Sequence, residues 1–305
     1  MKIRLNPIVK KDFQVAARSM RLSWGLFAYE ALLTGTFLLA LGVIQGINNY
    51  IYSDGNIYSS LIYLFPALAV SQVGIVALIV PIITSSSISG EKERQTFDIM
   101  LTTCMSPFSI VFGKVLSAVM RILFYVVAGM PIMALPFVVG GLSWSSLFYF
   151  LLAIILLSVF SGSIGIYCSS VCRRSITAVI LSFAFYFLFY GVTFVPMLVR
   201  LILNNGSGGE SMLLLLFNPI MFFEEFFMHI MSGNSLFGGE WGKSAFSQDE
   251  VGILTYALSR GTLWMFVSAA CILLVSFLFM FAAAWNVNPM HSMSGRKRGK
   301  RKGNV

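Results

Sequence analysis

The residues of this chain that could carry out chemistry are few and scattered. Its only two histidines, His229 and His291, lie far apart and on opposite predicted sides of a membrane. Cys168 and Cys172 are four residues apart, but no histidine or further cysteine lies nearby to complete a tetrahedral zinc site. No HExxH, GxGxxG or P-loop pattern occurs. The sequence therefore predicts no catalytic centre, no metal site and no ATP-binding motif in this chain.

The densest group of charges stands in the stretch SGEKERQTFDIMLTTCMSPFSIVFGK, residues 89–114. Apolar side chains recur at helical spacing over positions 97–104, and the charged residues of 91–98 fall on the other side. We therefore expect a short helix over about 89–105, polar on one face. Ser106 is a good N-cap and Pro107 suits a first helical position, so a second helix should begin there. Such a patch either connects two elements in solvent or docks a soluble partner, because mixed charges fix register and partner choice.

Composition decides which solvent must surround these elements. Of the 305 residues, 57% are hydrophobic and 11% charged, whereas about a quarter of a soluble domain is charged. Near-continuous apolar runs, without the alternation of a membrane barrel, are long enough to cross roughly 30 Å of hydrocarbon as helices. The fold class predicted is an all-α polytopic membrane protein with six transmembrane helices, at 24–47, 61–83, 115–139, 145–167, 177–203 and 262–286.

Lysine and arginine predict the orientation of these helices. They gather before the first span, between the second and third, between the fourth and fifth, and after the last. Short loops with this bias stay on the cytoplasmic side, so both termini are expected there, as an even number of spans requires. The basic tail over 287–305 could contact nucleic acid, but an anchor against anionic membrane lipid explains it better, and no nucleic-acid partner is predicted.

Three further features complete the predicted organisation around the six-helix domain of 24–286. Residues 1–23 have the pattern of an amphipathic helix in the cytoplasmic interface. In the segment 204–261, an apolar run is broken at Asn218 and Pro219, which predicts a re-entrant or interfacial pair of short helices on the outer side. Glu30 and Arg121 lie inside their spans, and a structural ion pair is favoured over a proton relay.

The charged stretch resembles the signature of the ABC-2 type transporter permeases. Gly90 to Leu101 reads GEKERQTFDIML and is followed by Pro107 and by Gly113-Lys114. That family shows G-E-x-E-x-G-T-x-E-x-L-L, then a proline, then G-K, between its second and third transmembrane helices. Gln95 stands where glycine is usual and Asp98 where glutamate is usual, and Gln95 suggests an uninterrupted helix. The six-span layout and the long segment before the last span are also similar to the family.

The resemblance implies a coupling helix that inserts into a cleft on a separate cytoplasmic ATP-binding subunit. Two such subunits would bind ATP and Mg and drive export, while this chain is not an enzyme and binds no cofactor. A second permease, identical or paralogous, would complete the complex in a bacterial plasma membrane, and the hairpin within 204–261 would cap the exit on the extracellular side. Arg173 and Arg174 would form a second contact. The main contact would comprise Gly90, Glu91, Glu93, Arg94, Thr96, Phe97, Asp98, Leu101, Pro107, Gly113 and Lys114.

Two other functions remain open from the sequence. An ion-coupled secondary carrier needs no ATPase, and an inverted repeat between 24–139 and 145–286 would favour it, but none is visible. A sensory or scaffold membrane protein is the third reading. The substrate is equally open, because a peptide or bacteriocin, a lipid-linked or amphipathic compound and an antibiotic all suit apolar spans in a chain with 28 phenylalanines.

Overall fold

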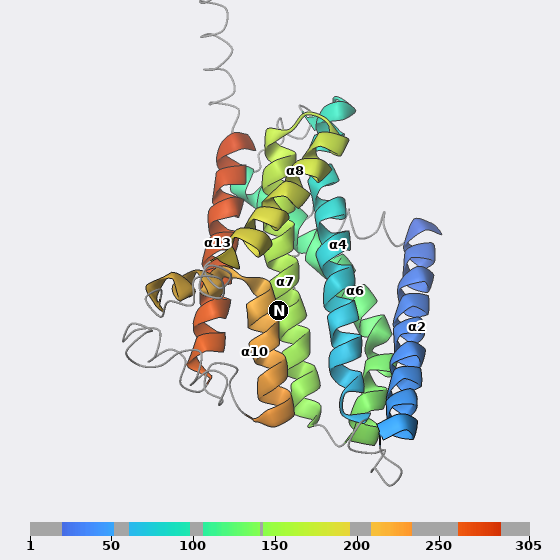
Figure 1. The fold of residues 1–305 in the computed structure, drawn as a ribbon. Helices are drawn as coiled ribbons and strands as arrows, with labels where there is room; N and C mark the ends of the chain where they lie inside the picture. The colour runs from blue at the N-terminus through green and yellow to red at the C-terminus, as the bar shows by residue number, and fades with distance from the viewer. Residues whose placement is uncertain are drawn as a thin grey trace, which may run out of the picture.

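The computed structural model describes residues 20–51, 61–97, 106–140, 143–195, 209–233 and 262–287, and every regular element within these ranges is helical (Figure 1). Six segments are long and apolar enough to cross a membrane, in agreement with the predicted fold class. The elements are α2 (Met20–Ile51), α4 (Leu64–Glu93), α6 (Pro107–Gly140), α7 (Trp144–Val171), α8 (Ser175–Phe187), the π-helix η1 (Leu188–Val192), the 3-10 helix η2 (Gly209–Phe217), α10 (Pro219–Ser232) and α13 (Leu263–Val287).

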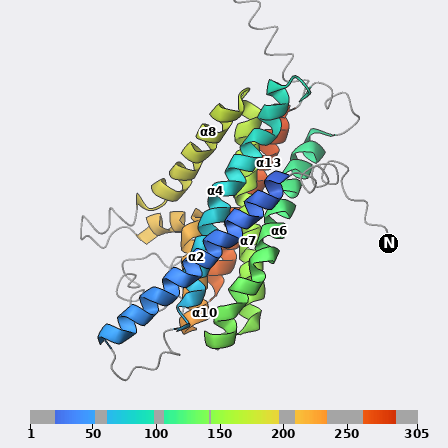
Figure 2. The same cartoon turned by 90° about the vertical axis from the view of Figure 1, so that its right-hand side faces the viewer.

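Helix α7 forms the centre of the bundle, with α4 and α13 packed closely against it (Figures 1 and 2). Small residues on α7 permit this approach. A Cβ atom added at Gly165 would lie 1.9 Å from Thr84 Oγ1 and 3.2 Å from the backbone nitrogen of Ser85, both on α4. The two helix backbones can therefore meet only because residue 165 has no side chain.

Helices α2 and α8 each pack against α4, and in Figure 2 α2 crosses in front of the bundle whereas α8 lies along its left edge. Their outer faces are apolar and exposed; the Phe187 side chain, for example, is 81% exposed. Such surfaces fit hydrocarbon rather than water, as expected for membrane-spanning helices.

The fifth span differs from its predicted bounds of 177–203. It begins at Ser175, its regular α-helix ends at Phe187, and one π-helical turn follows over Leu188–Val192. Thr193 Oγ1 donates a hydrogen bond to the Phe189 carbonyl oxygen, and the Tyr190 carbonyl oxygen accepts one from Asn218 Nδ2 at 3.4 Å. Side chains thus satisfy carbonyl groups that the end of a helix leaves without partners.

Asn218 joins η2 to α10 and is fully buried. Its Oδ1 accepts a hydrogen bond from Ile220 N at 2.9 Å, which caps α10, and Pro219 occupies the first turn. Its Nδ2 also donates to Thr193 Oγ1 at 2.7 Å. The predicted break at Asn218-Pro219 is therefore the junction of two short helices. The remainder of the 204–261 segment, residues 1–19 of the predicted interface segment and most of the 287–305 tail lie outside the described residues, and residues 20–23 are the start of α2.

Candidate functional site

The first residues of the charged motif form the last turn of α4, and residues 98–105 of the predicted helix lie outside the described residues. Residues Gly90 to Glu93 continue α4 without a break, and the chain leaves the helix at Arg94. Gln95 N donates to the Lys92 carbonyl oxygen at 3.2 Å, and Thr96 N donates to the Glu91 carbonyl oxygen at 3.0 Å. These two bonds are those of a Schellman motif, which ends a helix with one left-handed residue.

Gln95 is that left-handed residue, with φ at 59°. The uninterrupted helix expected from Gln95 is therefore wrong. Glycine adopts a positive φ at little cost, so the glycine of the family signature suits the same turn. Here glutamine takes the glycine conformation, and the helix still ends.

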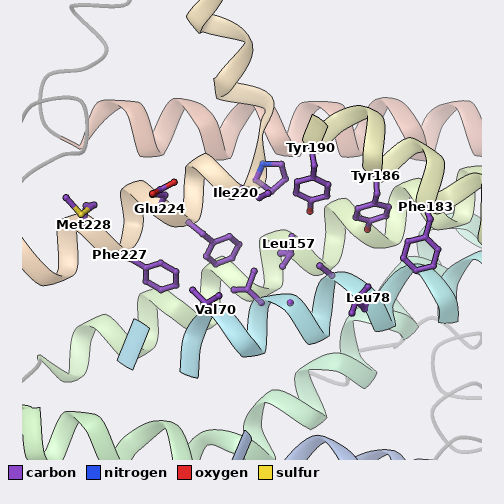
Figure 3. A pocket seen from close by; sticks show the side chains of 15 residues that line it. Val70, Leu78, Leu157, Phe183, Tyr186, Tyr190, Ile220, Glu224, Phe227 and Met228 are labelled. Carbon is purple, nitrogen blue, oxygen red and sulfur yellow. The ribbon is translucent and has the colours of Figure 1, made fainter. Parts of the chain in front are cut away.

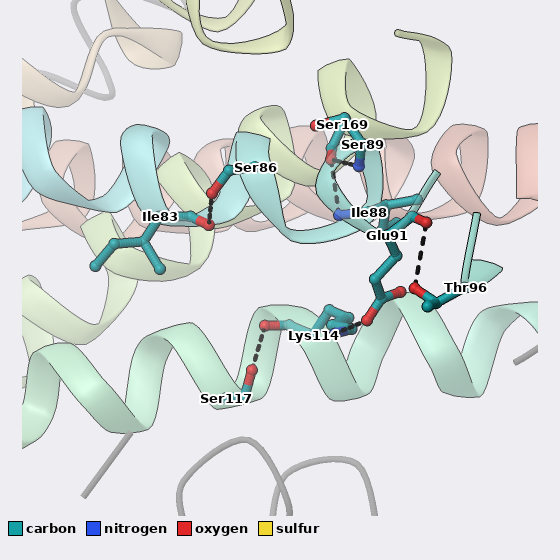
Figure 4. A network of polar contacts seen from close by, with 9 residues as sticks. All are labelled: Ile83, Ser86, Ile88, Ser89, Glu91, Thr96, Lys114, Ser117 and Ser169. Atoms are coloured by element: carbon teal, nitrogen blue, oxygen red, sulfur yellow. Dashed lines mark hydrogen bonds and ion pairs between the residues drawn. The ribbon is translucent and has the colours of Figure 1, made fainter. Parts of the chain in front are cut away.

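Glu91 of this turn forms an ion pair with Lys114 near the start of α6 (Figure 4). Lys114 Nζ lies 2.8 Å from Glu91 Oε1, and the two side chains are 7% and 29% exposed. The two ends of the signature, far apart in the sequence, therefore meet in space. Their ion pair joins the end of α4 directly to the beginning of α6.

The same turn is bonded to the end of α7. Ser169 Oγ accepts hydrogen bonds from Ile88 N at 2.9 Å and from Ser89 N at 2.8 Å (Figure 4). Lys92 Nζ donates to the Ser170 carbonyl oxygen, which places a positive charge at the negative end of the α7 dipole. Lys92 Nζ also lies 5.6 Å from the centroid of the Phe97 ring, within the range of a cation–π contact.

The turn is also hydrogen-bonded to the start of α8. Glu93 Oε2 accepts hydrogen bonds from Ser175 Oγ at 2.8 Å and from Ser175 N at 3.3 Å. Arg174, the N-cap residue of α8, makes no capping hydrogen bond with its own side chain. A carboxylate from another helix therefore caps α8, where the helix dipole favours negative charge. We call residues 88–93 of α4, with their partners at the ends of α6, α7 and α8, the α4 hub.

The predicted contact residues thus divide into two groups. Glu91, Glu93 and Lys114 bind within the chain, and half-buried Phe97 packs against a cluster formed by α4, α6, α7 and α13. In contrast, Arg94 and Thr96 have exposed side chains. In the remainder of the set, Gly90 lies in the last turn of α4 beside Ser175, Pro107 begins α6, Gly113 is buried in α6, and Arg173 and Arg174 are exposed next to the hub.

Asp98 and Leu101 lie outside the described residues. Sequence analysis did not identify Lys92, Ser169, Ser170 or Ser175 as members of the site. Ser169 and Ser170 stand at the end of a run of small residues in α7 that indicates close packing, and Ser175 begins α8, but nothing in that pattern points to the signature.

Glu30 and Arg121 are not paired in the structure. Glu30 Oε1 is buried without a hydrogen-bond partner, and no ion pair joins the two side chains within the part of the chain that the structure describes. Within the same ranges, no group of three or more metal-ligating side chains is present.

Six apolar helices with a cross-bonded charged turn at one end define a multi-pass α-helical membrane protein. The family described as ABC-2 family transporter protein matches residues 6–285. The chain therefore belongs to that family, and the prediction from its signature is confirmed. A search among curated proteins found no match to the chain.

Proposed function

We propose that the chain is the permease subunit of an ATP-driven exporter and couples ATP hydrolysis on a separate cytoplasmic subunit to movement of its own helices. Membership of the ABC-2 family supports a transport function. The α4 hub is the single observation that carries the coupling step, because it joins one helix end to three others.

The hub gives a short route from a docked partner to the membrane. A partner that displaces the segment between α4 and α6 acts on Glu91 and Lys114, which are held together at 2.8 Å. The bonds of Ser169 and Ser175 transfer the displacement from α4 to α7 and α8. Four helix ends are then expected to move together, since ion pairs and hydrogen bonds resist separation more than apolar contacts resist sliding.

The exposed residues of the turn supply the docking surface in this proposal. The Arg94 and Thr96 side chains are exposed, although Thr96 Oγ1 donates to the Glu91 carbonyl oxygen at 3.3 Å, and Arg173 and Arg174 are exposed beside the hub. These arginines suit an acidic groove on the ATP-binding subunit, because charge complementarity sets orientation and partner choice. Asp98 and Leu101 would extend the same contact.

The complete transporter would contain two permeases and two ATP-binding subunits, which hold ATP and Mg. Both termini of the permease would lie in the cytoplasm, with the hub at the cytoplasmic end of the bundle and the η2–α10 pair toward the outer side. The exit hairpin of the family corresponds to this pair. Export from a bacterial cell is the direction that we propose.

Co-purification and vanadate-sensitive ATP hydrolysis test this function. The chain would be co-expressed with ATP-binding subunits from its own genome, as wild type, Arg94→Glu and the control His229→Gln. Reversing the charge of Arg94 should reduce recovery of the ATP-binding subunit at least about fivefold. A glutamate at this position would face the acidic groove, and two like charges at an interface cost several kcal/mol. The control alters an exposed side chain on α10, far along the chain from the hub, and should bind as wild type does.

Arg94 is preferred to Glu93 or Phe97 for this test because both of those side chains have partners inside the chain. Their replacement would disturb the fold and the docking surface together. If no ATP-binding subunit associates with the wild-type chain, the proposal is wrong, and ion-gradient-driven uptake in liposomes would test a secondary carrier. If Arg94→Glu recovers as much ATP-binding subunit as the wild type does, the exposed turn is not part of the surface that binds this subunit.

A further inference from the structure

An apolar cavity of about 720 Å³ lies between the middle of α4, the end of α8 and the start of α10 (Figure 3). Its volume falls within the roughly 300–1,000 Å³ typical of pockets for small molecules. Five of the fifteen lining residues are aromatic: Phe183, Tyr186 and Tyr190 come from α8 and η1, and Phe223 and Phe227 come from α10. With aliphatic residues of α4 and Leu157 of α7, the cavity is built from five elements and is suited to a bulky apolar body.

Among the described residues that line the cavity, Glu224 is the one charged side chain, and none is a lysine or an arginine. The Glu224 carboxylate is exposed and makes no hydrogen bond or ion pair with the described part of the chain. Neighbouring Glu225, in contrast, is buried and has a partner. The exposed carboxylate is therefore not required to hold the helices together.

Aromatic faces and a carboxylate select the same kind of ligand. The face of an aromatic ring carries negative potential and attracts cations within about 6 Å. A carboxylate in weakly screened surroundings attracts a cation and repels an anion. A neutral acyl chain would gain nothing from Glu224, whereas a ligand with one positive centre and an apolar body would use every part of the lining.

We propose that this cavity binds an amphipathic organic cation, with its apolar body against the aromatic rings and its positive centre close to Glu224. The inference rests on the proposed export function, for which it names the class of substrate. It narrows the broad range of compounds that the sequence allows to those with a delocalised or quaternary positive charge.

A pair of ions with the same shape and opposite charge tests this proposal. The purified chain in nanodiscs of neutral lipid would be titrated with tetraphenylphosphonium and with tetraphenylborate, and partition into empty nanodiscs would be subtracted. We expect saturable binding of the phosphonium ion and none of the borate ion. Glu224→Gln should raise the Kd of the phosphonium ion about tenfold, which is the loss expected for one charge contact in a partly apolar site.

Two further variants separate charge from shape. Glu30→Gln removes a carboxylate from α2, which does not line the cavity, and should leave the Kd unchanged. Gly74→Leu places a side chain in the cavity and should abolish binding. An added Cβ at Gly74 meets no atom within 4 Å, so this variant should fold.

Equal binding of the two ions, or an unchanged Kd in Glu224→Gln, would overturn the proposal and leave the cavity as a non-selective apolar surface. The measurement uses the chain without an ATP-binding subunit. Its failure would therefore leave the co-purification result intact, and a missing ATP-binding subunit would not prevent ion binding.

Discussion

Lys114 illustrates how the environment of a single charge sets its energetic importance. Its side chain is only 7% exposed, and its ammonium group lies 2.8 Å from Glu91, which is 29% exposed. A buried charge that loses its partner costs several kcal/mol, because water cannot replace the lost interaction. The more exposed member can recover hydration, so the two members of the pair should not be equally sensitive to replacement.

We therefore expect Glu91→Gln to destabilise the chain more than Lys114→Met. The first variant leaves a buried ammonium without its carboxylate, at a cost of about 1–3 kcal/mol. The second leaves a carboxylate on the more exposed of the two side chains, although its Oε2 is buried. Thermal unfolding of the detergent-purified chain measures the difference as the two shifts in Tm. The exchanged pair Glu91→Lys with Lys114→Glu should recover part of the loss, and an equal loss in both single variants would contradict the argument.

The sequence predicts the faces of such residues but not what covers them. The spacing of three and four predicts a polar and an apolar side for the charged stretch, but α4 ends at Glu93 and residues 98–105 lie outside the described residues. However, it cannot show that Glu91, Glu93 and Lys114 meet atoms of the same chain, because their partners lie on other helices. Gln95 shows the opposite difficulty. Glutamine favours a helix interior, yet the chain turns there because the two Schellman bonds of the backbone outweigh the preference of one side chain.

At the scale of elements, the contact between α4 and α7 depends on Gly165. A Cβ at this position would overlap Thr84 Oγ1 at 1.9 Å and would also approach Thr84 Cβ at 2.9 Å. Rotation of the threonine hydroxyl relieves only the first overlap. The helices must then move apart, which disturbs the adjoining bonds of Ser169 as well.

Gly165→Ala should therefore destabilise the chain by about 1–3 kcal/mol, as expected for overpacking. Gly162→Ala on the same helix is the matched control. Its added Cβ would lie 3.5 Å from Val115 Cγ1, an ordinary contact, and alanine improves helix propensity. Unfolding in increasing denaturant gives both free energies. If Gly162→Ala is the less stable of the two variants, close packing at Gly165 does not determine how stably α7 packs against α4.

The elements themselves follow well from hydropathy, because a span needs little more than length and apolar composition. Their ends follow less well. Helix α4 continues to Glu93, beyond the predicted 83, since the charged turn is held by partners on other helices. The end of α8 changes to a π-helical turn whose freed groups bond to Asn218, a residue that the sequence identified only as a break.

For the whole molecule, the placement of lysine and arginine predicts that the α4 hub faces the cytoplasm and that the start of α7 faces the outside. Single cysteines at Thr96 and Ser145 test this arrangement in a background that lacks the four native cysteines. Both side chains are exposed and lie at opposite ends of the bundle. In intact cells, a membrane-impermeant maleimide should label Ser145→Cys alone, and permeabilised cells should allow labelling of Thr96→Cys. Labelling of Thr96→Cys in intact cells would reverse the topology.

The fifth span is attached at both of its ends by side chains from other elements. Ser175 at its start bonds to Glu93, and Tyr190 and Thr193 at its end bond to Asn218. Between these attachments, much of its surface is apolar and exposed. Helix α8 with its π-helical turn thus forms a continuous link between the charged turn and the start of α10. A movement of the hub along the axis of this link would tilt α10 and change the shape of the cavity that both helices enclose.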